Sequence, residues 1–145
     1  MGDEARALTA RARQQVYGHF EALAPRMGPV DLVLTSPLVR TVQTAQILSF
    51  ALKHEGLLRA HRSLLPDMPV GALDGVLAEH PGSGLALVGH APSMGYMAAR
   101  LLGMQSFPKP VPPGTVIGLD RPDAEGRPAQ LLFFAQPGQP VLDTL

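Results

Sequence analysis

The chain has 145 residues, 46% of them hydrophobic, and its 12 Lys and Arg residues balance its 12 Asp and Glu residues. This length and apolar fraction fit one globular domain, and a balanced charge gives no general attraction to nucleic acid or anionic membrane. The sequence has no cysteine, which excludes disulfides, thiolate catalysis and cysteine-ligated metal. It has no apolar run of roughly 18 residues, no signal peptide and no myristoylation pattern, so we expect a cytoplasmic protein that does not insert into membranes.

The first elements predicted along the chain are a helix and a short buried strand. Apolar residues at helical spacing favour a helix over residues 10–24, and Thr9 fits its N-cap. The apolar run at residues 30–35 is typical of a strand buried on both faces.

A second helix is predicted directly after this strand. Ser36 fits an N-cap and Pro37 the first helical position, where the missing N–H of proline costs nothing. Arg40 lies in the first turn. The helical spacing continues to about His54, and Gly56 fits a C-terminal cap.

The middle of the chain contains an ambiguous segment, two predicted helices and one further predicted buried strand. Residues 57–65 are ambiguous, and residues 70–80 favour a helix. Residues 85–88, "LALV", form a second compact apolar run and are predicted to be a buried strand. A helix is expected over residues 93–102, ended by Gly103.

The chain closes with a predicted hairpin. The segments "TVIGLD" and "QLLFFA" flank "RPDAEGRP", a polar stretch rich in turn residues. With the alternating helices and strands before it, this pattern predicts an α/β fold. We expect a three-layer sandwich with a mainly parallel sheet, helices on both faces and a C-terminal antiparallel hairpin.

Two polar corners follow the two clearest strands. Arg40 lies in the helical turn after residues 30–35, and His90 follows the strand at residues 85–88. In open α/β sheets, ligands bind beyond the carboxyl ends of the strands, where helix N-termini attract anions. Arginine donates a planar fork of hydrogen bonds to phosphate, and histidine can donate to an anion or move a proton near neutral pH. The pair suggests a site for phosphate or another small oxyanion.

The same residues also have ordinary structural explanations. An arginine in a first helical turn is often solvated or ion-paired locally, and a histidine after a buried strand often bonds to backbone. No two histidines have the spacing of a zinc site with a carboxylate partner. Asp67 could donate a proton, but a solvated turn residue is the better explanation. We interpret the other four histidines as surface residues: His19, His54, His61 and His80.

Three segments carry a resemblance to a known family. "VDLVLTSPLVRTVQTAQIL", residues 30–48, is similar to a Ser-Pro-x-x-Arg-x-x-Gln-Thr-Ala segment, and "LALVGHAPSMGYMAARLLG", residues 85–103, to a segment around a second histidine. "ARALTARARQQV" resembles a Leu-Thr-x-x-Gly-x-x-Gln helix opening, with Ala12 in place of glycine. These are segments of the histidine phosphatase superfamily, also called phosphoglycerate-mutase-like. The short length and the closing hairpin resemble its SixA-type phosphohistidine phosphatases.

The resemblance implies a chemistry and a set of roles. Members of the family transfer a phosphoryl group to a nucleophilic histidine and hydrolyse the phosphohistidine with water, using no metal or organic cofactor. By the match, Arg40 is one of two arginines that clamp the phosphoryl group, and His90 is the second histidine, which donates to its oxygens. Ser36 lies beside this site without an assigned role. The implied partner is phosphate or a protein that bears phosphohistidine.

One part of the family pattern is missing. The nucleophile and the other arginine come from an Arg-His-Gly motif on a first strand, and no "RHG" occurs in the 145 residues. His19 lies inside the predicted first helix and cannot replace it. We therefore expect a chain that is truncated at its N-terminus relative to the family and inactive as it stands. Without that strand, sheet edges would be unpaired, so a rearranged terminus or a second copy is expected to fill the gap.

Three hypotheses follow. The sequence could start downstream of the true start of a phosphatase, which translation of the upstream DNA would test. It could be a module that binds phosphate or a phosphoprotein without turning it over. It could also be an unrelated α/β scaffold, with Arg40 and His90 far apart.

Overall fold

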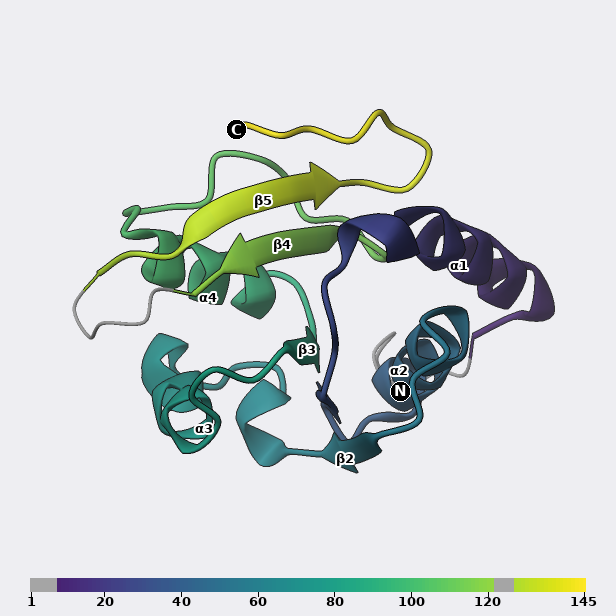
Figure 1. The fold of residues 1–145 in the computed structure, drawn as a ribbon, viewed down its shortest axis with the longest axis horizontal. Helices are drawn as coiled ribbons and strands as arrows, with labels where there is room; N and C mark the ends of the chain where they lie inside the picture. Colours follow the sequence, from purple (N-terminus) through teal and green to yellow (C-terminus); the bar gives the residue numbers. More distant parts are fainter. Residues whose placement is uncertain (1–7, 122–126) are drawn as a thin grey trace. The chain divides into compact units, whose positions relative to one another are not determined.

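The computed structural model describes residues 8–121 and 127–145, and its helices and strands alternate along most of the chain (Figure 1). The α-helices are α1 (Ala10–Leu23), α2 (Val39–Ala51), α3 (Asp74–Glu79) and α4 (Ser93–Leu102). The strands are β1 (Leu32–Thr35), β2 (Leu57–Ala60), β3 (Leu85–Val88), β4 (Val116–Asp120) and β5 (Gln130–Ala135). Short 3-10 helices are η2 (Ala24–Arg26), η3 (Arg62–Leu64) and η4 (Val70–Leu73).

These elements form two compact units. Unit 1 contains the chain up to Met68 together with Ser83–His90, and unit 2 contains Pro69–Gly82 together with the chain from Ala91 onward. The chain therefore leaves unit 1 after Met68, enters unit 2, and returns at Ser83–His90 to complete unit 1.

Unit 1 is built on a parallel sheet with the strand order β2-β1-β3. The register places Thr35, the last residue of β1, between Ala60 of β2 and Val88 of β3, so the carboxyl ends of the three strands are level. All four residues of β1 are buried, whereas β2 is mostly exposed. A central strand that is buried on both faces reads as a continuous apolar run, which explains why "LVLT" has no polar alternation.

Helix α2 covers this sheet, and α1 packs against α2. The Thr9 side chain accepts a hydrogen bond from the Ala12 N–H at 3.0 Å and caps α1. Helices α1 and α2 lie side by side in Figure 1, and α2 also contacts all three strands. The apolar core of unit 1 consists of Leu8, Phe20, Leu23, Leu32, Val33, Leu34, Ala45, Leu48, Ala51 and Leu64.

Unit 2 is built on the antiparallel pair β4-β5 and on α3 and α4. Helix α4 ends at Gly103, whose φ of 72° is the left-handed conformation that glycine adopts readily. The exposed pair Arg100 and Asp74 joins α4 to the start of α3 at 2.7 Å, and the hydrogen bond from Arg100 lowers the pKa of Asp74. Phe133 and Phe134 of β5 are buried in the core of this unit.

Most of the predicted elements are confirmed. The α/β class, the parallel sheet, the closing hairpin, the Thr9 cap and the end of α4 at Gly103 all agree with the structure. The ambiguous residues 57–65 form the edge strand β2 followed by η3, and the predicted helix at 70–80 is divided into η4 and α3. Part of the predicted turn of the hairpin, residues 122–126, lies outside the described residues, as do residues 1–7.

Two predicted helix caps are wrong. Helix α2 begins at Val39 with Leu38 as its N-cap residue and no side-chain cap. The Ser36 hydroxyl instead lies 2.8 Å from His90 Nε2 and accepts from the Leu38 N–H at 3.4 Å, before the helix begins. At its other end α2 stops at Ala51, and Lys53 takes the left-handed conformation, with φ of 53°, that was expected at Gly56.

No helix in the described parts of the chain is both long and apolar enough to cross a membrane. Strand β3 is hydrogen-bonded to β1 on one edge, and no other strand of the described residues pairs with its second edge.

Candidate active site

Ser36 is held rigidly at the point where β1 ends. Its backbone N–H donates to the Val88 carbonyl at 2.9 Å, which ties it to the end of β3. Its own carbonyl accepts hydrogen bonds from the hydroxyls of Thr35 and Thr41, both at 3.0 Å. The residue has no exposed surface, so its hydroxyl is fixed inside unit 1.

His90 meets this hydroxyl from the neighbouring strand. Its Nε2 lies 2.8 Å from the Ser36 Oγ, and the His90 residue is 7% exposed. Because the ends of β1 and β3 are level, the first residues beyond the two strands converge. The contact between Ser36 and His90 therefore brings the residues after β1 and the residues after β3 together at one site in unit 1.

Arg40 lies four residues after Ser36, as the second residue of α2, and is half-buried. Its Nε is buried and has no hydrogen-bond partner. The Arg40 side chain also forms no salt bridge with any residue that the structure describes. A buried N–H without a partner costs roughly 1–3 kcal/mol, and a bound anion would remove that cost. Arg40 is thus a donor that lacks its acceptor, at the start of the helix that follows Ser36.

A hollow of about 460 Å³ lies on the other side of the Ser36 corner. We call it the Pro37 hollow, and it is lined by Pro37, Ala60, His61, Arg62 and Leu65. Its floor is the carboxyl end of β2, since the His61 N–H donates to the Thr35 carbonyl at 2.8 Å. Sequence reasoning did not identify this hollow, because it depends on β2, which was ambiguous.

Of the other residues considered as candidates, His61 lines the Pro37 hollow and His54 has a structural role. His54 is half-buried and not a surface residue, because its ring joins the carbonyls of Val30 and Leu57 at 3.1 and 3.0 Å. His19, His61 and His80 are half-buried as well. Asp67 is exposed, with a left-handed φ of 66°, as expected of a turn residue. Among residues 8–121 and 127–145, no group of three histidines and carboxylates could hold a metal ion.

Comparison with known proteins identifies the fold. The structure matches the protein histidine phosphatase SixA complexed with tungstate at a TM-score of 0.81 and 19% identity, over 94% of this chain and 87% of that one. It matches the protein assigned as phosphohistidine phosphatase SixA from Agrobacterium tumefaciens at 0.76 and 20% identity, over 94% and 87%. A similar assignment from Nakamurella multipartitia gives 0.73 and 22% identity, over 96% and 89%.

The chain therefore has the histidine phosphatase fold that the three sequence segments suggested. No protein-family model matches the sequence, and no curated protein matches it either. At these identities the likeness establishes the fold, and the activity must be argued from the residues of the corner.

Proposed function

We propose that this protein is a homologue of the SixA-type phosphohistidine phosphatases and that it binds a phosphoryl group at Arg40 and His90. The observation that supports this most is the buried Nε of Arg40 without a partner, on the second residue of α2 and four residues after Ser36, which is bonded to His90. A phosphoryl oxygen can accept from a guanidinium, and the His90 ring can donate to a second oxygen. The tungstate in one SixA structure is a tetrahedral oxyanion of the same shape class.

The proposal separates binding from turnover. Hydrolysis in this family passes through a nucleophilic histidine within an Arg-His-Gly motif, and the 145 residues contain no such motif. A residue that forms a covalent intermediate supplies many powers of ten in rate, so we expect the polypeptide of this sequence to bind phosphate and leave phosphoesters intact. No cofactor takes part.

The partner is expected to be phosphate or a protein that carries phosphohistidine. A balanced charge gives no reason for binding nucleic acid or a membrane, and a cytoplasmic location belongs to the same proposal.

We also propose that residues 1–145 act as one domain and that a strand pairs with the second edge of β3. An unpaired edge in a parallel sheet is a template for another strand, which a second copy of the chain or a rearranged terminus could supply. Sedimentation over a range of concentrations would distinguish a dimer from a monomer.

Isothermal titration with inorganic phosphate tests the binding site. Arg40→Ala should abolish measurable affinity, whereas Arg11→Ala, which removes an exposed arginine from α1, should leave it unchanged. Unchanged affinity in Arg40→Ala would rule out the site. Incubation of the same polypeptide with p-nitrophenyl phosphate tests turnover separately, and sustained hydrolysis would contradict the non-catalytic part of the proposal.

A further inference from the structure

The Pro37 hollow adjoins the proposed phosphate corner and has the chemistry of a second anion subsite. Pro37, in its wall, directly follows Ser36, whose hydroxyl contacts His90. Strands β2 and β3 flank β1, and neighbouring strands are about 4.8 Å apart, so the ends of β2 and β3 are separated by roughly 10 Å. One extended ligand could therefore reach both places.

The local hydrogen bonding of His61 in the hollow leaves its Nε2 as a hydrogen-bond donor. The Nδ1 of His61 accepts a hydrogen bond from the Ser63 backbone N–H at 3.1 Å. A neutral imidazole that accepts at Nδ1 carries its proton on Nε2, so that Nε2 can only donate. This nitrogen suits an acceptor such as a carboxylate oxygen.

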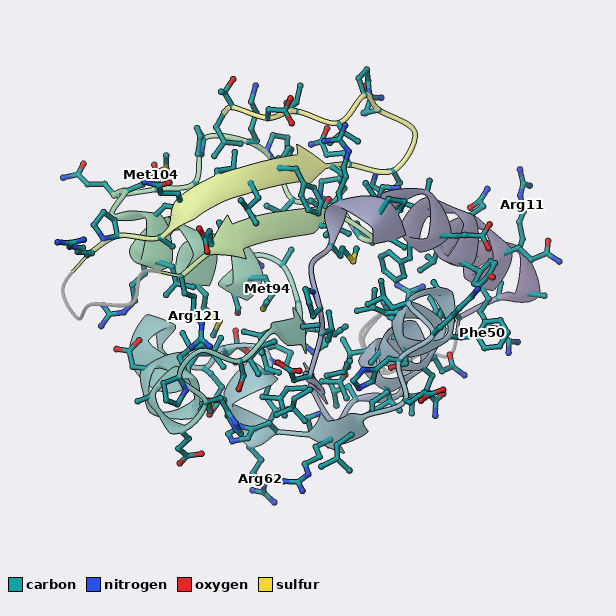
Figure 2. The ribbon with its side chains drawn as sticks, viewed as in Figure 1. Arg11, Phe50, Arg62, Met94, Met104 and Arg121 are labelled. Carbon is teal, nitrogen blue, oxygen red and sulfur yellow. The ribbon has the colours of Figure 1, made fainter. Side chains whose placement is uncertain are left out.

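The arginine in the hollow adds a positive charge that the described chain does not neutralise. Arg62 is exposed, forms no salt bridge with a described residue and projects outward from η3 in Figure 2. The stretch "GLLRAHRSLLP", residues 56–66, contains no carboxylate. Apolar walls at Pro37 and Leu65 next to a guanidinium and an imidazole fit a short acidic side chain with a methylene stem.

We propose that the Pro37 hollow binds an Asp or Glu side chain of the phosphorylated partner protein, at a position about three residues from its phosphorylated residue. The spacing follows from the separation of roughly 10 Å between the two strand ends, since an extended chain advances about 3.3 Å per residue. This assignment rests on the proposed function, because the phosphoryl group anchors the partner at Arg40 and His90. It adds a sequence preference: the protein should favour phosphorylated partners that have an acidic residue at this position.

Fluorescence anisotropy with two labelled peptides tests the subsite. Both carry a stable phosphohistidine analogue, and they differ only in having Glu or Gln three residues away, on either side in separate pairs. Wild-type protein should bind the Glu peptide of one pair about two- to fivefold more tightly, the range of an exposed ion pair, and the preference should weaken with salt. Arg62→Gln should remove the preference, and Arg62→Glu should reverse it toward a peptide with Lys at that position.

Arg11→Gln is the matched control, because Arg11 is an exposed arginine of unit 1 that projects from α1, away from Arg62 (Figure 2). It should keep the full preference, and a loss there would show general electrostatic attraction and overturn the subsite. Equal wild-type affinity for Glu and Gln peptides in both pairs would overturn the subsite while leaving phosphate binding intact. If neither peptide bound wild-type protein, the proposed function itself would fail, and the subsite with it.

Discussion

Removal of the Ser36 hydroxyl should destabilise the protein by more than its size suggests. Ser36→Ala deletes one oxygen and leaves the backbone bonds of that residue in place. What disappears is the 2.8 Å partner of His90 Nε2, together with the longer hydrogen bond of 3.4 Å that the hydroxyl accepts from the Leu38 N–H. Since Ser36 has no exposed surface, water cannot readily take the place of its hydroxyl.

The expected magnitude follows from this burial. A buried polar group that loses its partner costs about 1–3 kcal/mol, and we take about 2 kcal/mol for Ser36→Ala. A chain of 145 residues unfolds with an entropy of about 0.3 kcal/mol/K, so the melting temperature should fall by roughly 7 °C. Phosphate affinity should fall with it, because the His90 ring loses one of the contacts that hold its orientation.

Ser49→Ala is the control for the same chemical change. The Ser49 hydroxyl in α2 is buried and has no hydrogen-bond partner, and alanine favours a helix by up to about 0.5 kcal/mol over serine. Its melting temperature should stay level or rise. Differential scanning calorimetry of both variants, with phosphate titrations on the folded proteins, makes the comparison. If Ser36→Ala melted no lower than Ser49→Ala, the Ser36–His90 contact would contribute nothing, and our account of the corner would be wrong.

Three further changes probe packing and charge. Leu34 in β1 is 3% exposed, and Leu34→Ala should lower the free energy of unfolding in urea by about 3 kcal/mol. Leu57 in β2 is 56% exposed, and Leu57→Ala should lower it by less than about 0.5 kcal/mol. Similar losses in the two variants would contradict the assigned core. Gly56→Ala should cost about 1–3 kcal/mol in the same assay, because a Cβ there would lie 2.7 Å from His54 Cε1 and 2.8 Å from the Asp31 carbonyl oxygen. A neutral result would mean that both the ring and this backbone shift easily. Asp74→Asn should lose a small stabilisation above about pH 4, where the carboxylate is charged even in the unfolded chain, because its arginine partner lowers the pKa of Asp74 in the folded state. That difference from wild type should vanish as the pH falls through the lowered pKa, and a difference that persisted in acid would exclude the ion pair as its source.

The elements that the sequence predicted well are those whose own residues determine them. β1 and β3 are continuous apolar runs with Gly or Ser at their ends, and Gly103 is suited to the left-handed end of α4. Such signals are local, so no knowledge of the rest of the fold was needed.

The features that sequence reasoning missed depend on contacts between distant residues. Serine is a residue type that commonly caps helix N-termini, but the hydroxyl of Ser36 is hydrogen-bonded to the ring of His90. The two residues are 54 positions apart, so no local signal in the sequence predicts this contact. Strand β2 is short and mostly exposed, and it is defined by its pairing with β1 more than by its own residues. Arg40 and His90 were selected as site residues by type and position, and their joint role in binding an anion stays a prediction.

The discontinuous course of unit 1 has a consequence for the order in which the protein matures. Parallel strands cannot pair until a crossover brings them together, so β1 keeps one bare flank until β3 has left the ribosome. His90 is the last residue of that unit, and it reaches Ser36 only when the third strand docks. The contact between Ser36 and His90 thus depends on nascent-chain length. Ribosome-stalled polypeptides that are too short for β3 to have left the ribosome should show a protease-sensitive β1, and those long enough to expose β3 a protected β1.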